Sequence, residues 1–327
     1  MPIEAPLWYP AGMASTAATL PPPPTIIVGG GAVGLTLAMV FAGAAPTALI
    51  VKPAQRERLA AQPLRLRGAR SLLLPPGALT VTTTLEPREF PAGAHIWLAV
   101  KAYDLGGAIE WLAPRLPPAA VVVIISNGLG VYAEAAAALG GRASLVRVLP
   151  SFGAALGGPG EVILAGDIVA AVAAPQSAAS SAHAVSTRLR AANGIVTEER
   201  DVALAEWKKA AVNMIVNPLC TLAGAPNGAL LDDPTLHALV PPLLEEIRSI
   251  ALTAGHDLGG LTAAAFFEGL KVHAANTNSM LVDIRAGRRT ELDYISGRFL
   301  QVADTHRAAA PLSRSLYELV KTVEMLR

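Results

Sequence analysis

The stretch "TIIVGGGAVGLTLAMVFAGAA", residues 25–45, decides the first half of the fold. A short β-rich run leads into a glycine turn and then into a helical pattern of small and apolar residues. Gly29, Gly31 and Gly34 have the G-x-G-x-x-G spacing, which permits a tight turn, close approach of a pyrophosphate and close packing of the helix on the strand. Free N–H groups and the dipole at the helix start favour an anion. A plain glycine turn is the alternative, but the context predicts a dinucleotide site formed by Gly29, Gly30, Gly31, Ala32, Val33 and Gly34.

Strands and helices continue to alternate up to about residue 198. Helical patterns at 104–116, 131–141 and 177–192 separate most of the apolar runs, and Gly166 and Asp167 join two strands within 161–174. This alternation predicts an α/β fold with a Rossmann-type, doubly wound parallel sheet. The other predicted strands are 25–28, 47–53, 95–102, 121–128, 144–151 and 195–198.

The pattern changes after residue 198. Residues 201–222, 236–255 and 295–309 read as helices, and no convincing strand remains. Residues 1–24 end in four prolines, carry Glu4 and have no basic start, which indicates a flexible leader and argues against a secretory signal. We therefore expect a dispensable leader at 1–24, a Rossmann domain at 25–198 and an all-helical C-terminal domain at 199–327, which carries the substrate and the catalytic residues.

Composition restricts the class of protein. The net charge of +1 gives no reason to expect nucleic acid or an anionic membrane as a partner. Mean hydropathy is +0.45, yet no uncharged apolar run reaches the length of a membrane span, so a cytoplasmic protein is expected. A single cysteine, Cys220, excludes a disulfide framework and a metal site built on several thiolates, and we expect no metal. The sequence does not fix the oligomeric state, and a homodimer is one possible assembly.

The residues at the end of the second strand indicate whether the cofactor is NAD or NADP. An acidic residue there would accept a hydrogen bond from the ribose 2′-hydroxyl of NAD. The sequence "VKPAQRER" instead supplies Lys52, Arg56 and Arg58, and cations suit a 2′-phosphate. The alternative is a solvated basic loop. We predict NADP(H) as the cofactor, with a preference for NADPH over NADH on the order of tenfold to a hundredfold.

Polar residues also occur where the fold would bring them together. Lys101 and Asn127 follow two predicted strands, whose carboxyl ends line the ligand crevice. Lys209, Asn213 and Asn217 are four residues apart on an otherwise apolar helix, so their side chains share one face. Because Asn217 precedes Pro218, its alternative role is to cap a restarted helix. The charged stretch 276–294 reads, on periodicity alone, as a solvated helix–turn–helix.

Taken together, these residues resemble the ketopantoate reductases (2-dehydropantoate 2-reductases). The resemblance covers residues 25–325 and rests on the glycine motif, "VKAYD", "SNGLG", "EWKKAAVNMIVNPL" and, most specifically, "NSMLVDIRAGRRTELDYISG". It implies a Rossmann domain followed by an all-helical domain, with the site in the cleft. It also implies reduction of the small-molecule 2-oxo acid 2-dehydropantoate to pantoate by NADPH, a step of pantothenate and coenzyme A biosynthesis.

The resemblance implies a role for each matching residue. Lys209 matches the proton donor, and Glu291 matches a cofactor contact that we also expect to orient Lys209. Lys52 and Lys101 match NADP-binding positions, and Ala154 matches a loop residue against the nicotinamide half. The positions that match substrate contacts are Asn127, Lys209, Asn213, Asn217, Asn227 and Ser279.

Three alternatives remain open. Val282 stands where some relatives have glutamine, so another branched 2-oxo acid is an alternative substrate. Dehydrogenases of the 3-hydroxyisobutyrate or 6-phosphogluconate type also place a lysine four residues before an asparagine, but the charged stretch 283–293 speaks against them. A non-catalytic protein that senses NADP(H) should have lost Lys209 or Glu291, and both are present.

Overall fold

The structure is a computed structural model that describes residues 23–326, so nearly all of the expected leader lies outside the described residues. Its first half contains an eight-stranded sheet in the order β12-β11-β8-β7-β6-β1-β2-β5. The strands are β1 (Thr25–Val28), β2 (Thr47–Ile50), β5 (Thr80–Thr82), β6 (His95–Leu98), β7 (Val121–Ile124), β8 (Ser144–Pro150), β11 (Val169–Ala173) and β12 (Ile195–Glu199).

The six strands from β8 to β5 are all parallel. Their order is that of a Rossmann fold, which confirms the predicted α/β class. The sheet is not wholly parallel, however, because β11 pairs antiparallel with β8 and β12 runs parallel to β11. No crossover helix separates β8 from β11, so the chain returns along the sheet in the opposite direction.

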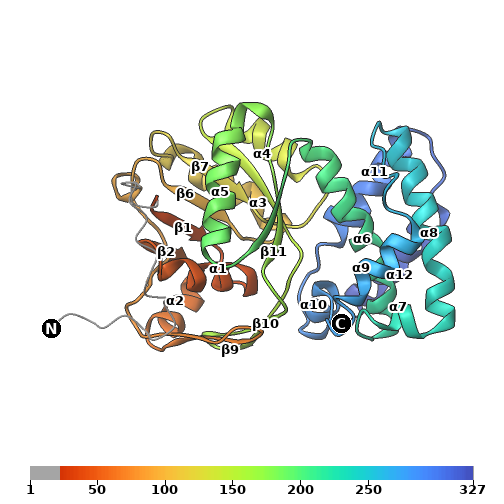
Figure 1. Cartoon of the computed structure of the whole chain (residues 1–327), viewed down its shortest axis with the longest axis horizontal. Helices are drawn as coiled ribbons and strands as arrows, with labels where there is room; N and C mark the ends of the chain where they lie inside the picture. Colours follow the sequence, from red (N-terminus) through yellow and green to blue (C-terminus); the bar gives the residue numbers. More distant parts are fainter. Residues whose placement is uncertain (1–22, 327) are drawn as a thin grey trace.

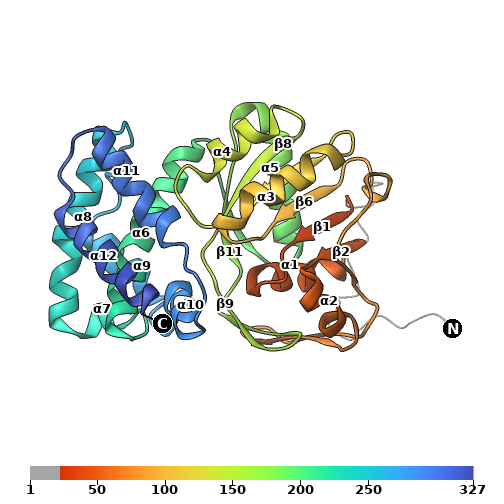
Figure 2. The same ribbon diagram turned by 180° about the vertical axis from the view of Figure 1, so that it is seen from behind.

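Helices cover both faces of this sheet. On one face α1 (Ala32–Ala42) and α5 (Ala179–Ala191) pack against Ile27 and Trp97 (Figure 1). On the other face α3 (Ala102–Leu112) and α4 (Val131–Leu139) pack against Ile26, Ile96 and Val122 (Figure 2). Burial of both faces explains why the strands are continuous apolar runs. The short elements are α2 (Pro53–Ala60) and the 3-10 turns Pro87–Glu89, Ala113–Arg115 and Gln176–Ala178.

A second sheet was not predicted from the sequence. It has four strands in the order β4 (Leu72–Leu74), β3 (Leu64–Gly68), β10 (Glu161–Ala165) and β9 (Gly153–Gly158), and it lies below α1 in Figure 1. Leu66, Val162 and Leu164 share one core with α1, so this helix is packed between two sheets. The two strands predicted within 161–174 both form, but β10 and β11 belong to different sheets.

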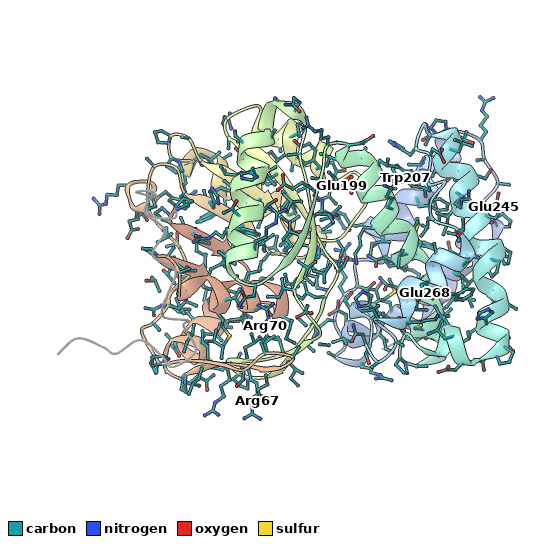
Figure 3. All side chains as sticks on the ribbon, viewed as in Figure 1. Arg67, Arg70, Glu199, Trp207, Glu245 and Glu268 are labelled. Atoms are coloured by element: carbon teal, nitrogen blue, oxygen red, sulfur yellow. The ribbon has the colours of Figure 1, made fainter. Side chains whose placement is uncertain are left out.

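The second half of the chain is helical, and after residue 199 the described part contains no strand. Trp207 of α6 (Val202–Ala223), labelled in Figure 3, lies in the helical core. Its ring packs edge to face on Phe299 of α11 (Arg298–Thr305), with ring centroids 6.1 Å apart. None of the described helices has the length and apolar character needed to span a bilayer. The elements are α6 (Val202–Ala223), α7 (Ala229–Asp232), α8 (Pro234–Thr253), α9 (Ala263–Lys271), α10 (Ser279–Arg285), a π-helical turn (Asp293–Gly297), α11 (Arg298–Thr305) and α12 (Pro311–Met325).

Helix α6 carries the row of polar residues and leads from one half of the molecule into the other. Asp201 caps its start by accepting a hydrogen bond from Leu204 N (2.9 Å), and Gly224 in the left-handed conformation (φ 63°) ends it. The helix runs without interruption through Pro218, so the alternative in which Asn217 caps a restarted helix is wrong. Pro218 is buried, and packing on α8, α10 and α12 offsets its missing hydrogen bond.

Candidate active site

One large cavity of about 1750 Å³ joins the carboxyl edge of the main sheet to the helical half. Carboxyl ends of parallel strands are where ligands of such folds bind. Most of the residues expected to form the site lie in its wall, and the exceptions are Gly34, Arg56 and Arg58. Those in the wall are Gly29, Gly30, Gly31, Ala32, Val33, Lys52, Lys101, Asn127, Ala154, Lys209, Asn213, Asn217, Asn227, Ser279 and Glu291.

The glycine loop is shaped by contacts that a side chain would prevent. Gly29 has φ +122°, and a Cβ atom there would lie 2.4 Å from the carbonyl oxygen of Ala99. A Cβ on Gly34 would lie 2.0 Å from Gly29 O, so Gly34 serves the packing of α1 behind the loop and not the cavity. In front of Gly31 there is no atom within 4 Å of a Cβ position. The residues therefore fit a dinucleotide, whose phosphates would be held by the start of α1.

The predicted basic trio is reduced to one residue. Lys52, just after β2, is in the cavity wall, but Arg56 and Arg58 are not. Moreover, Lys52 Nζ forms an ion pair with Asp104 Oδ2 at 3.1 Å. Asp104 comes from α3 and also lies in the wall, so the acid that the sequence lacked at the strand end is supplied from elsewhere in the chain.

A charged network joins the two halves of the molecule beside the cavity. Lys101 Nζ is 2.6 Å from Asp283 Oδ2 and 3.5 Å from Glu291 Oε2. Asn127 donates to Glu291 Oε2 (2.9 Å), and Ala102 N donates to Glu291 Oε1 (3.0 Å). Burial alone would lower the pKa of Lys101, but the Glu291 and Asp283 carboxylates outweigh burial and raise it. Glu291 therefore holds Lys101 and Asn127, and among the described residues it makes no ion pair with Lys209.

Lys209 has an environment different from that of Lys101. It is half-buried and faces the cavity, and no carboxylate in the described range lies within ion-pair distance of it. Burial, assisted by the positive charge of Arg147, lowers the pKa of Lys209 to about 8. Asn213 and Asn217 follow it at successive turns of α6 and share the cavity wall. Lys208 is exposed at the same wall.

Asn227 and His273, from connecting segments, and Ser279 of α10 also lie in the cavity wall. Asn227 Nδ2 donates to the carbonyl oxygen of His273 (3.2 Å), and its buried Oδ1 atom has no hydrogen-bond partner among the described residues. Ser279 is the exposed first residue of α10, which Asn278 caps by accepting from Leu281 N (3.0 Å). Sequence reasoning missed His273, whose pKa is lowered by burial and by the charge of Lys209.

The arrangement suits the reduction of a carbonyl group. A half-buried ammonium with a lowered pKa can give up a proton near neutral pH. Neutral amides and a hydroxyl offer hydrogen bonds to a small polar acid, and they cost less to desolvate than further charges would. The glycine loop at the other end of the same cavity supplies the place for a dinucleotide.

Comparisons with known proteins agree with this geometry. A family model described as ketopantoate reductase PanE/ApbA matches residues 25–175, and its C-terminal counterpart matches residues 201–324. The 2-dehydropantoate 2-reductase of Yersinia pestis is 28% identical over 243 residues, which are 74% of this chain and 78% of that protein. The crystal structure of a PanE/ApbA family ketopantoate reductase from Ralstonia eutropha is similar with a TM-score of 0.79 at 22% identity, covering 93% of this chain and 99% of that one.

A second similar fold is that of D-mandelate dehydrogenase with NADH and anilino(oxo)acetate. Its TM-score is 0.81 at 20% identity, and the match covers 93% of this chain and 98% of that one.

Proposed function

Because this chain belongs to the ketopantoate reductase family, we propose that it reduces the 2-oxo group of 2-dehydropantoate to the hydroxyl of pantoate. It is an oxidoreductase that acts on a CH–OH group and depends on a nicotinamide cofactor. The observation that carries the proposal is the single cavity that has the glycine loop at one end and Lys209 at the other.

Lys209 is the proton donor in this proposal. A bound reduced nicotinamide supplies a hydride to the carbonyl carbon, and the carbonyl oxygen then needs a proton. With a pKa of about 8, the Lys209 ammonium is mostly protonated at pH 7 but gives up its proton far more readily than an exposed lysine. Its positive charge also stabilises the developing alkoxide before the proton moves.

The amides hold the 2-oxo acid against Lys209. Asn213 and Asn217 lie one and two turns further along α6, on the same side as Lys209. Asn227 faces the same wall, and the His273 carbonyl fixes the direction in which its amide group points. Ser279 adds a hydroxyl from the start of α10. Orientation of this kind reduces the entropy lost when the reacting atoms are brought together.

For the cofactor we propose NADPH, with a smaller preference than the sequence alone predicts. Lys52 provides one cation for the 2′-phosphate, but Asp104 partly neutralises it and can accept from the 2′-hydroxyl of NADH. One charge-assisted contact is worth about 1.5–3 kcal/mol, and the adjacent carboxylate reduces that gain. We therefore expect a preference for NADPH of about tenfold. Asp104→Asn should raise the preference, and Lys52→Ala should abolish it.

The test of the reaction is the loss of reduced-cofactor absorbance with a panel of 2-oxo acids. The panel contains 2-dehydropantoate, 2-oxoisovalerate and benzoylformate, each offered with NADPH and with NADH. The proposal expects the highest kcat/KM with 2-dehydropantoate. A higher kcat/KM with benzoylformate would transfer the assignment to another 2-oxo acid reductase, and no turnover with any of the acids would refute the enzyme assignment.

A further inference from the structure

A buried ion pair lies beneath the cavity and has no part in the reaction described so far. It joins Arg147 on β8 to Glu206 on α6, with Arg147 Nε 2.7 Å from Glu206 Oε1. The side chains are 1% and 3% exposed. Such a pair overcomes its desolvation cost only when its remaining polar atoms also find partners. The other hydrogen-bond partners of the two side chains therefore indicate what the pair does.

Arg147 holds the end of the strand that leads into the cavity. Its Nη1 atom donates to the carbonyl oxygens of Ile124 (3.1 Å) and Val148 (3.0 Å), and its Nη2 atom donates to that of Ser126 (2.6 Å). Asn127 is the next residue after Ser126, and its side chain is in the cavity wall. Arg147 thus anchors the backbone immediately before Asn127.

Glu206 holds the other end of the same loop. Its Oε2 atom accepts from Gly130 N (3.0 Å) and its Oε1 atom accepts from Tyr132 N (3.1 Å), at the start of α4. A carboxylate is favoured at this end of a helix. Glu206 also lies three residues before Lys209 on α6, so the two residues are neighbours along one helical face. The pair consequently connects the Asn127 loop to the turn of α6 that bears Lys209.

We propose that Arg147 and Glu206 are a positioning pair, which fixes the loop 126–130 relative to Lys209 and keeps a permanent cation beneath the proton donor. Neither residue lines the cavity, so neither touches the substrate. The proposal rests on the proposed role of Lys209 in the reduction. It adds two residues, 59 positions apart in the sequence, that act on the site through others.

The charges around Lys209 support this assignment. The pKa of Lys209 is lowered first by burial and then by Arg147, which approaches α6 from β8. His273 lies in the segment after α9, and its lowered pKa leaves its imidazole uncharged at neutral pH and above. Glu199, Lys208 and Asp257 are further charged residues of the cavity wall. Glu206 carries the charge that opposes Arg147, so removal of one or the other should move the pKa of Lys209 in opposite directions.

The experiment measures the ionisation of Lys209 without relying on turnover. The rate at which acetic anhydride acetylates Lys209 is followed against pH by peptide mass spectrometry, in the full chain and in variants. Arg147→Met should raise the pKa of Lys209 and Glu206→Gln should lower it, each by about half a pH unit or more. The double variant, which loses both charges, should return close to the wild-type value. Glu206→Gln keeps the test valid if Arg147→Met alone fails to fold.

Turnover gives a second readout that separates charge from geometry. Arg147→Lys keeps the charge but loses the forked hydrogen bonds to Ile124 and Ser126, so kcat should fall at least about tenfold while the alkaline limb of the kcat–pH profile stays in place. Arg147→Met should both lower kcat and move that limb to higher pH. If the acetylation pKa of Lys209 is the same in Glu206→Gln as in the wild type, the proposal is overturned. That result is independent of which 2-oxo acid is reduced.

Discussion

Replacement of Lys209 by alanine tests the centre of the proposed reaction. With a pKa of about 8, about nine tenths of the Lys209 side chains are protonated at pH 7, so nearly the whole population can act as the acid. A positioned general acid contributes roughly 10²–10⁴-fold. Lys208 is exposed and His273 is neutral, so neither is a suitable replacement for Lys209 as the acid. We therefore expect kcat to fall by roughly 10²–10⁴-fold, equivalent to about 3–5 kcal/mol.

Although Lys209→Ala should lower kcat, it should not lower the thermal stability of the protein. A lysine whose pKa is lowered on folding is charged in both states at pH 7, so its burial disfavours the folded state. Lys209→Ala removes that cost, and its Tm should equal or exceed that of the wild type. Binding of NADPH, followed by fluorescence titration, should change little. In the wild type, reduction should slow above about pH 8 as Lys209 loses its proton, and this limb should be absent from the variant.

Lys208→Ala is the matched control, because it removes the same side chain from the next position of the same helix. Its kcat should stay within about threefold of the wild-type value, since Lys208 is exposed and points about 100° away from Lys209. The reasoning fails if Lys209→Ala retains near-normal kcat, or if it unfolds. Either result would mean that the polar row on α6 has a purely architectural role.

Three further predictions concern other parts of the molecule. Gly34→Ala should lower the free energy of unfolding by about 1–3 kcal/mol in denaturant titrations and weaken NADPH binding, because the new Cβ atom would lie 2.0 Å from Gly29 O. Burial and the charge of Arg188 lower the pKa of His95 from 6.5 to about 4, so as the pH falls the unfolded chain takes up a proton at His95 before the folded protein does. The free energy of unfolding should therefore be highest above pH 6.5 and decline by about 2–3 kcal/mol toward pH 4. His95→Gln should lack this pH dependence. Cys220 is buried, with its pKa raised by burial to about 12, and should react with a thiol reagent only after unfolding in guanidinium.

Much of the fold could be read from local pattern, and the gaps have identifiable causes. The strand–glycine–helix pattern at 25–45 and the alternation that follows it are local, so the Rossmann-type fold class was accessible. The second sheet was missed although "LRLR" at 64–67 alternates buried leucine with exposed arginine, because β4 and β9 carry little signal of their own. The strands within 161–174 were recognised, but strand assignment does not specify the pairing partner.

The site shows the same division between local and distant signals. The positions of Lys209, Asn213 and Asn217 followed from helical periodicity alone. Lys52 was expected to act with Arg56 and Arg58, but these do not lie in the cavity wall, and Asp104 from α3 is the charged residue beside Lys52. No pattern in the sequence pairs Asp104 with Lys52, which are 52 positions apart. Contacts of this kind depend on the tertiary fold, which periodicity does not encode.

The pairing of β3 with β10 determines when the four-stranded sheet can be completed during synthesis. Arg65 of β3 faces Glu161 of β10, so nearly one hundred residues separate the two strands of a parallel pair. At roughly 5–20 residues per second, the ribosome needs on the order of 5–20 s to make that interval. Until then β3 has only β4 as a neighbour, and one edge of the hairpin, with Leu64 and Leu66, has no strand beside it. The nascent chain therefore passes through a stage that exposes an unpaired apolar edge, the form of chain most prone to aggregation.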